Sequence, residues 1–178
     1  MTESDPGVKQ IFVAAGWDGI APALLVRGGD QTLELLSGRD EASRIWPVST
    51  GLAGFGNREN SGCTPTGLHR ISACIGAGAS LGSVFKGREL TGEVVGVKTE
   101  SGGDYITSRI LWLDGLELGI NQGGEVDSHN RYIYIHGTPY EQQLGQPVSA
   151  GCVRMANTDV LELFDLVQVE TLVLILEE

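Results

Sequence analysis

The stretch Tyr132-Ile-Tyr-Ile-His-Gly-Thr138 alternates large β-forming side chains and then reaches a histidine and a glycine. Alternation of this kind is typical of a β-strand. We therefore expect a strand over residues 132–136 that carries His136 to the rim of a sheet, where Gly137 lets the chain turn. Further along, Ser149-Ala-Gly-Cys-Val-Arg154 places Cys152 after a glycine and shortly before a helical pattern. A base and a thiol at an exposed bend are the two groups that cysteine acyl transfer requires.

Short apolar runs separated by Gly- and Asp-containing turns recur along the rest of the chain. Gly and Asp accept positive φ at little cost, so these separators are typical of turns between strands. The runs predict strands at residues 9–14, 23–27, 32–36, 43–48, 67–72, 92–98, 105–113 and 171–176.

One helix is predicted after Ala156, where Asn157 or Thr158 can cap and an apolar stripe runs to Val167. Residues 141–144 are a weaker helix or a loop, and residues 51–65 are expected to form an ordered loop. The chain is therefore predicted to be mostly β, a β-sandwich of mixed sheets with one capping helix near the C-terminus. We expect one domain over residues 1–178, with residues 1–7 as a flexible tail.

The charge balance bears on the class of partner. The 178 residues carry 12 basic and 23 acidic side chains, a formal net charge of −11. Such a balance disfavours a nucleic acid or an anionic membrane surface as the partner. Residues 11–15 are too short an apolar run to span a membrane.

The cysteines and histidines give no sign of a metal site. Cys63, Cys74 and Cys152 form no CxxC pair, and the three histidines lie far apart in the sequence. Cys63 and Cys74 are expected to be buried or half-buried thiols, with a disulfide as the alternative in an exported protein. His69 and His129 are expected to be hydrogen-bonded or solvated rather than catalytic. No metal and no cofactor are expected.

The amino terminus carries acids and lacks the basic and long apolar regions of a signal peptide. We expect either a cytoplasmic protein, or a protein of the periplasm or cell envelope whose export segment has been removed. The tryptophans Trp17, Trp46 and Trp112 fall in or beside predicted strands and are expected in the core rather than on a sugar-stacking surface.

Four motifs in order resemble the L,D-transpeptidase catalytic domain (YkuD-like) family. They are Pro47-Val-Ser-Thr-Gly51, Thr64-Pro-Thr-Gly67, His136-Gly-Thr138, and Ser149-Ala-Gly-Cys-Val-Arg-Met155 with Asn157 and Asp159. The resemblance implies a β-sandwich fold and a reaction on peptidoglycan stem peptides. In that reaction a cysteine attacks the L,D amide between residues three and four, forms a thioester and passes the acyl group to an amine, which makes a 3–3 cross-link.

Roles follow from the resemblance by position. Cys152 would be the nucleophile, His136 the base, and the Gly137 carbonyl the group that orients the imidazole. Amides around Gly151 and Cys152 would form the oxyanion hole, and Ser149, Gly151, Arg154 and Thr138 would bind substrate. For Arg154, an ion pair with Asp159 or Glu162 is the alternative to a substrate carboxylate. The buried structural cysteine and the strand-end histidine held by a carbonyl remain the alternatives for Cys152 and His136.

One position departs from the family pattern. Many members carry a second histidine two residues before the cysteine, where this chain has Ala150. His136 is then the one candidate base in the motifs, and the acceptor is open. An L,D-carboxypeptidase that uses water in murein recycling is the alternative to the transpeptidase, and intact His136 and Cys152 disfavour a non-catalytic wall-binding module. The resemblance also implies reactivity toward carbapenems.

Overall fold

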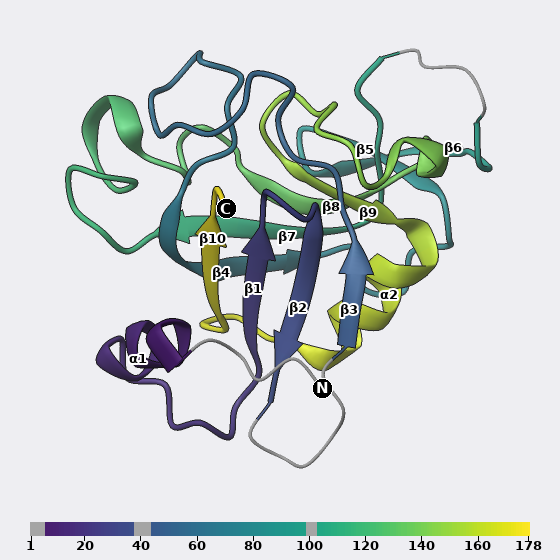
Figure 1. The fold of residues 1–178 in the computed structure, drawn as a ribbon. Helices are drawn as coiled ribbons and strands as arrows, with labels where there is room; N and C mark the ends of the chain where they lie inside the picture. The colour runs from purple at the N-terminus through teal and green to yellow at the C-terminus, as the bar shows by residue number, and fades with distance from the viewer. Residues whose placement is uncertain (1–5, 38–43, 99–102) are drawn as a thin grey trace.

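The computed structural model describes residues 6–37, 44–98 and 103–178, and their strands form one mixed β-sheet (Figure 1). The strands are β1 (Ala23–Arg27), β2 (Thr32–Leu36), β3 (Arg44–Pro47), β4 (Gly67–Ile75), β5 (Ser83–Lys86), β6 (Glu89–Val94), β7 (Ile106–Gly115), β8 (Tyr134–Thr138), β9 (Val153–Ala156) and β10 (Leu172–Leu176). The helices are α1 (Pro6–Ala14), α2 (Asn157–Leu166) and the short 3₁₀ turns η1 (Gly124–Val126) and η2 (Glu141–Gln143).

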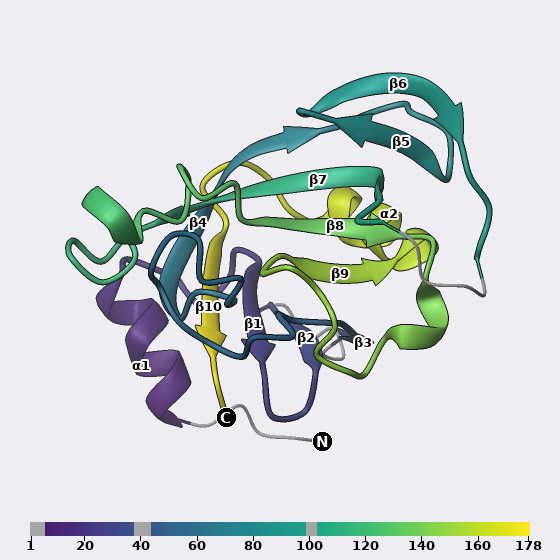
Figure 2. The ribbon, with the colours of Figure 1, turned by 90° about the horizontal axis from the view of Figure 1, so that it is seen from above.

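The sheet runs in the order β3-β2-β1-β10-β4-β7-β5-β6, with β8 on the free edge of β7 and β9 on β8. Two pairings, β1 with β10 and β8 with β9, are parallel, and the other strand pairings are antiparallel. The sheet curls, so that β7, β8 and β9 lie over the layer of β1, β2 and β3 (Figure 2). The expectation of a mostly β, mixed-sheet fold with one late helix is confirmed, with the strands joined in one curled sheet.

A backbone bridge closes the curl. The amide of Ser49, just after β3, donates to the carbonyl of Arg154 at 3.0 Å, and the amide of Arg154 donates back to the carbonyl of Ser49 at 2.9 Å. The main core fills the space inside the curl, where Val160 and Leu163 of α2 pack against strand residues such as Ile135. Burial of that apolar surface is what holds the two layers together.

The first helix was not predicted. Residues 9–14 were expected to form a strand, and they belong to α1, which begins at Pro6 and so also includes the last two residues of the expected tail. Val8 and Phe12 are buried, while Gln10 between them is exposed. A strand would place all three residues on one face, so this burial pattern is that of a helix. Val8 and Phe12 cover the outer side of the sheet at Leu25 and Leu174, which explains why β1 and β10 are continuous apolar runs.

The hairpin of β5 and β6 also differs from expectation. Residues 92–98 were predicted as a strand, but β6 ends at Val94, and β5 was missed. Gly87 and Arg88 both have positive φ, 57° and 70°, and form the tight turn between the two strands. Residues 1–5 of the expected tail and residue 43 of an expected strand lie outside the described part of the chain. Within the described part, none of the helices is long and apolar enough to cross a membrane.

A buried histidine stands among the polar groups of β4. His69 has no exposed surface, its Nε2 lies 2.9 Å from the Ser128 hydroxyl, and its Nδ1 lies 3.0 Å from the Gly67 carbonyl oxygen. Burial lowers the pKa of His69 to about 4. The expectation that this histidine is hydrogen-bonded is confirmed.

Replacing Phe12 with Ala should lower the free energy of unfolding by about 3 kcal/mol, because it leaves a cavity between α1 and the sheet. The neighbouring change Val13→Ala, at a side chain 59% exposed, should cost less than about 0.5 kcal/mol. Urea unfolding followed by circular dichroism measures both. Similar losses for the two variants would contradict the helical packing.

His69 should make stability depend on pH. Its pKa is near 6.5 in the unfolded chain and about 4 in the folded protein. Between these values the unfolded chain takes up a proton that the folded protein does not, so stability falls as the pH drops from 6.5 to 4, by about 3 kcal/mol from this group. Urea unfolding at several pH values should show this slope reduced in His69→Gln. An unchanged slope would mean that folding does not lower the pKa of His69.

Candidate active site

Strand alternation brings the predicted nucleophile and base onto one face. Ile135 of β8 and Val153 of β9 point into the main core. The residues before and after them therefore point to the opposite side, which places His136, Cys152 and Arg154 on one face of neighbouring strands. The parallel register pairs His136 with Arg154 directly.

The imidazole of His136 is buried and uncharged. Its Nδ1 lies 2.7 Å from the carbonyl oxygen of Gly137, and its Nε2 has no hydrogen-bond partner among the described residues. Burial is the largest cause that lowers the pKa of His136, with the Gly137 carbonyl acting in the opposite direction. A carbonyl only accepts, so the Nδ1 carries the proton and the Nε2 holds a free lone pair. This is the tautomer that a general base needs.

Gly137 has no room for a side chain. A Cβ at this position would lie 2.5 Å from the Thr107 carbonyl oxygen and 2.8 Å from the Asn157 side-chain oxygen. The glycine therefore lets β8 approach β7 closely, directly after the histidine.

The thiol of Cys152 is half-buried and protonated. The amide of Tyr134 donates to its Sγ at 3.4 Å, and the Sγ lies 3.5 Å from the carbonyl oxygen of Tyr132. Burial raises the pKa of Cys152 to about 12, although the Tyr134 amide lowers it. The thiol therefore does not ionise by itself at neutral pH and needs a base.

The surroundings of the thiol differ from the sequence-based expectation in one respect. Cys152 was placed near a helix N-terminus, but β9 intervenes before α2 begins at Asn157. The reason is that Val153 and Met155 alternate into the core, so a strand continues directly from the cysteine. The helix dipole therefore does not act on the sulfur at close range.

Ser149 holds the turn that presents the cysteine. Its hydroxyl accepts from the Gly151 amide at 3.1 Å and donates to the Cys152 carbonyl at 2.6 Å. Gly151 has a φ of 123°, and a Cβ there would lie 3.0 Å from the Cys63 carbonyl oxygen. The turn therefore needs glycine, and its Gly151 amide, expected as an oxyanion donor, is bonded within the turn.

The two upstream motifs support the same turn. The Ser149 amide donates to the Thr50 carbonyl at 2.8 Å. The Thr64 hydroxyl accepts from the Gly51 amide at 2.8 Å and donates to the Gly151 carbonyl at 2.8 Å. Segments that lie far apart in the sequence thus meet around the cysteine.

Arg154 forms an ion pair that was not predicted. Its guanidinium donates to Asp104 at 2.7 Å, and its side chain is 9% exposed. The sequence had suggested Asp159 or Glu162 as the protein partner, but Glu162 pairs with Arg44. Asp104 was not among the candidate partners, because only the order of β7, β8 and β9 in the sheet brings it to Arg154.

Thr138 is buried and bonded within the protein. Its hydroxyl accepts from the Tyr140 amide at 3.2 Å, and its carbonyl accepts from the Asn157 side chain at 3.0 Å. Thr138 was expected to bind substrate, and in the structure its hydroxyl and its carbonyl are both hydrogen-bonded within the protein.

Asn157 fastens the end of β8 and does not cap α2. Its side-chain oxygen accepts from the Thr107 hydroxyl at 2.6 Å, and its nitrogen holds Thr138. The residue at the N-cap is Ala156, which makes no side-chain cap bond, and the Glu141 carboxylate accepts from the Asn157 amide at 2.9 Å. A carboxylate from η2 thus replaces the predicted Asn157 or Thr158 cap.

Two arginines, of which Arg131 acts on the thiol, were not found from the sequence. Arg131 donates to the Cys63 carbonyl at 2.6 Å and to the Gly56 carbonyl at 3.2 Å, and its charge lowers the pKa of Cys152. Arg88 lies over the ring of Trp112 at 4.6 Å and donates to the Tyr134 hydroxyl at 3.1 Å. Neither has a sequence signal, because both lie in turns between elements.

The other cysteines, histidine and tryptophans considered from the sequence are described by their burial and packing. Cys63 and Cys74 are free, half-buried thiols. The His129 ring stacks on Trp112, with centroids 3.9 Å apart. Trp46 is in the core as expected, whereas Trp112 is only partly buried. Within the described ranges, no cluster of three or more His, Cys, Asp or Glu side chains could hold a metal ion.

Comparison with known proteins identifies the family. Residues 22–175 match the model of the L,D-transpeptidase catalytic domain, YkuD. YqjB of Bacillus subtilis (strain 168), provisionally named an L,D-transpeptidase, is 48% identical over 48 residues, which are 27% of each chain.

Two solved structures share the fold. An L,D-transpeptidase (residues 123–326) from Xylanimonas cellulosilytica DSM 15894 has a TM-score of 0.55 at 16% identity, covering 95% of this chain and 69% of that one. L,D-transpeptidase 3 from Mycobacterium tuberculosis, solved with a faropenem-derived adduct, has a TM-score of 0.53 at 14% identity, covering 87% and 60%. Because the family model spans most of its length, this chain belongs to the L,D-transpeptidase catalytic domain family.

Proposed function

We propose that the protein is an L,D-transpeptidase that acts on peptidoglycan stem peptides with Cys152 as nucleophile and His136 as base. The observation that carries this proposal is the neutral His136 imidazole, whose Nε2 lone pair is free and which shares a strand face with the thiol one strand away. Family membership supplies the substrate class.

The first half-reaction makes a thioester. The Cys152 proton moves to His136 Nε2 while the sulfur attacks the carbonyl carbon of the L,D amide between residues three and four. The Tyr134 amide, already bonded to the sulfur, stabilises the thiolate that develops. The imidazolium then returns the proton to the leaving amine, and the terminal D-residue departs. For the Gly151 amide to donate a hydrogen bond to the oxyanion, its hydrogen bond to the Ser149 hydroxyl must first break.

The acceptor decides between two products. An amine of a neighbouring stem peptide gives the 3–3 cross-link, and water gives a tripeptide. Ala150 favours hydrolysis by water, because the alanine at this exposed position offers no side-chain hydrogen bond to hold an amine acceptor. An L,D-carboxypeptidase is therefore the second candidate function. The periplasm or cell envelope suits the transpeptidase, and the cytoplasm suits a carboxypeptidase of murein recycling.

Incubation with a disaccharide-tetrapeptide, with and without a second stem peptide, should give dimer or tripeptide by mass spectrometry. Cys152→Ser should abolish both products with little loss of stability, because it changes the nucleophile more than the volume. Dimer supports the transpeptidase and tripeptide alone supports the carboxypeptidase. Activity that survives Cys152→Ser would overturn the proposal.

Acylation by β-lactams tests the nucleophile independently of peptidoglycan. L,D-transpeptidase 3 from M. tuberculosis carries a faropenem-derived adduct. We expect faropenem and a carbapenem such as imipenem each to add one adduct to the Cys152 peptide of this protein. Adducts that form equally well in Cys152→Ser would argue against this cysteine.

His136→Ala should lower turnover at least about 100-fold, because it removes the base that is proposed to accept the thiol proton. Alkylation of Cys152 by iodoacetamide should survive at high pH, where hydroxide removes the proton. His129→Ala, which removes the ring stacked on Trp112, is the matched control and should keep its turnover. A loss of alkylation at every pH would indicate a structural role for His136.

A further inference from the structure

The guanidinium of Arg154 is buried but only partly satisfied. Its side chain is 9% exposed, it has one ion-pair contact, with Asp104, and its Nε has no hydrogen-bond partner in the described part of the chain. Arginine carries five N–H donors in a fork that suits a carboxylate bound through two oxygens. A buried donor without a partner is costly, so this site has capacity for a better-placed anion.

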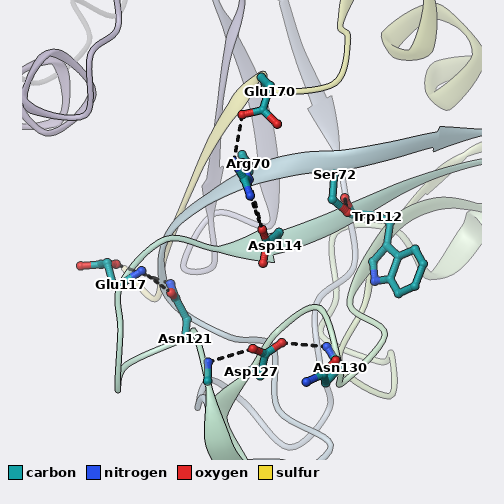
Figure 3. A network of polar contacts seen from close by, with 10 residues as sticks. Arg70, Ser72, Trp112, Asp114, Glu117, Asn121, Asp127, Asn130 and Glu170 are labelled. Atoms are coloured by element: carbon teal, nitrogen blue, oxygen red, sulfur yellow. Dashed lines mark hydrogen bonds and ion pairs between the residues drawn. The ribbon is translucent and has the colours of Figure 1, made fainter.

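The other ion pair between an arginine and an aspartate among the described residues, Arg70 with Asp114, is made differently. Arg70 donates to Asp114 through both Nε, at 3.1 Å, and a terminal nitrogen, at 2.8 Å, and its other terminal nitrogen donates to Glu170 at 3.1 Å (Figure 3). Arg70 is also more exposed, with 38% of its side chain in contact with solvent. The more deeply buried arginine is thus the less satisfied one.

Asp104 is a weakly held partner. Its side chain is 47% exposed, and it lies in the loop that leads into β7 rather than in a strand. A half-exposed carboxylate regains water when it rotates away, so leaving Arg154 costs Asp104 little. Arg154 itself cannot follow, because its backbone belongs to β9 and bridges Ser49.

The ion pair adjoins the reacting atoms. Since β8 lies between β7 and β9, a contact from Arg154 to Asp104 spans the strand that carries His136. Both charges act on His136 and on Cys152, the carboxylate raising and the guanidinium lowering the pKa of each. An anion bound to Arg154 would therefore lie beside the thiol and the imidazole.

We propose that Arg154 is a carboxylate subsite that Asp104 occupies in the free protein and that a substrate carboxylate takes by exchange. This inference rests on the proposed function for its ligand, the free C-terminal carboxylate of the D-residue that leaves. The exchange keeps one negative charge on Arg154 throughout, so the buried cation is never left alone. It also selects stem peptides with a free terminus over those whose terminus is amidated or extended.

Two reagents of nearly equal size test this subsite. Iodoacetate carries a carboxylate and iodoacetamide is neutral, and with both the sulfur displaces iodide while the thiol proton goes to a base. We measure the two rate constants at Cys152 by mass spectrometry of its peptide, which separates this residue from Cys63 and Cys74. In Asp104→Asn the subsite is vacated, and the ratio of iodoacetate to iodoacetamide rates should rise about tenfold, the size of one charge-assisted hydrogen bond.

Two further variants show where the effect arises. Asp114→Asn removes the same charge from the Arg70 ion pair and should leave the ratio unchanged. Combining Asp104→Asn with Arg154→Gln should return the ratio to the wild-type value, because the receiving cation is gone. Arg131, the other cation that acts on Cys152, is unchanged in all three variants.

The outcomes separate this proposal from the proposed function. An unchanged ratio in Asp104→Asn, or an equal rise in Asp114→Asn, overturns the subsite even if tetrapeptide is turned over. A raised ratio that needs Arg154 supports the subsite even if no tetrapeptide product forms. A Cys152 that neither reagent labels in any variant counts against both.

Discussion

The parallel pairing of β8 with β9 is the interaction on which the site depends. It sets His136 opposite Arg154 and puts Cys152 on the same face. A shift of one residue would turn the thiol toward the core, since neighbouring side chains on a strand point to opposite faces. Two contacts hold the register at its ends: Ser149 fixes the turn before β9, and Asn157 ties the end of β8 to the start of α2.

The same pairing depends on closure of the sheet. Arg154 exchanges two backbone hydrogen bonds with Ser49, while its side chain reaches Asp104. The bridge also brings Thr50 and Thr64 to the cysteine turn. Although β9 is short, it is hydrogen-bonded on both sides, to β8 on one side and to Ser49 on the other. The stability of the fold and the placement of the thiol therefore have a common origin.

How far the sequence predicts this site depends on which contacts are local. Alternation around His136 and the glycine before Cys152 point to these two residues as the proposed base and nucleophile, since both signals lie within a few residues. The helix α1 was missed because Val8 and Phe12 reveal a helix only once the sheet beneath them is known. Asp104 was missed because its contact with Arg154 depends on the order of strands in the sheet. The raised pKa of Cys152 follows from tertiary burial, which sequence spacing does not encode.

The electrostatics of the resting site favour two neutral groups. Burial raises the pKa of the Cys152 thiol and lowers that of the His136 imidazole, so the proton stays on sulfur and the charged pair is disfavoured. In the proposed reaction, the imidazolium would therefore form with substrate present, where the carbonyl takes up the negative charge as it develops. Asp104 and Arg154 act on the pKa of both groups in opposite directions and so offset one another in part. Exchange of one carboxylate for another on Arg154 would preserve that offset, so a substrate can bind beside the base without changing its readiness to accept the proton.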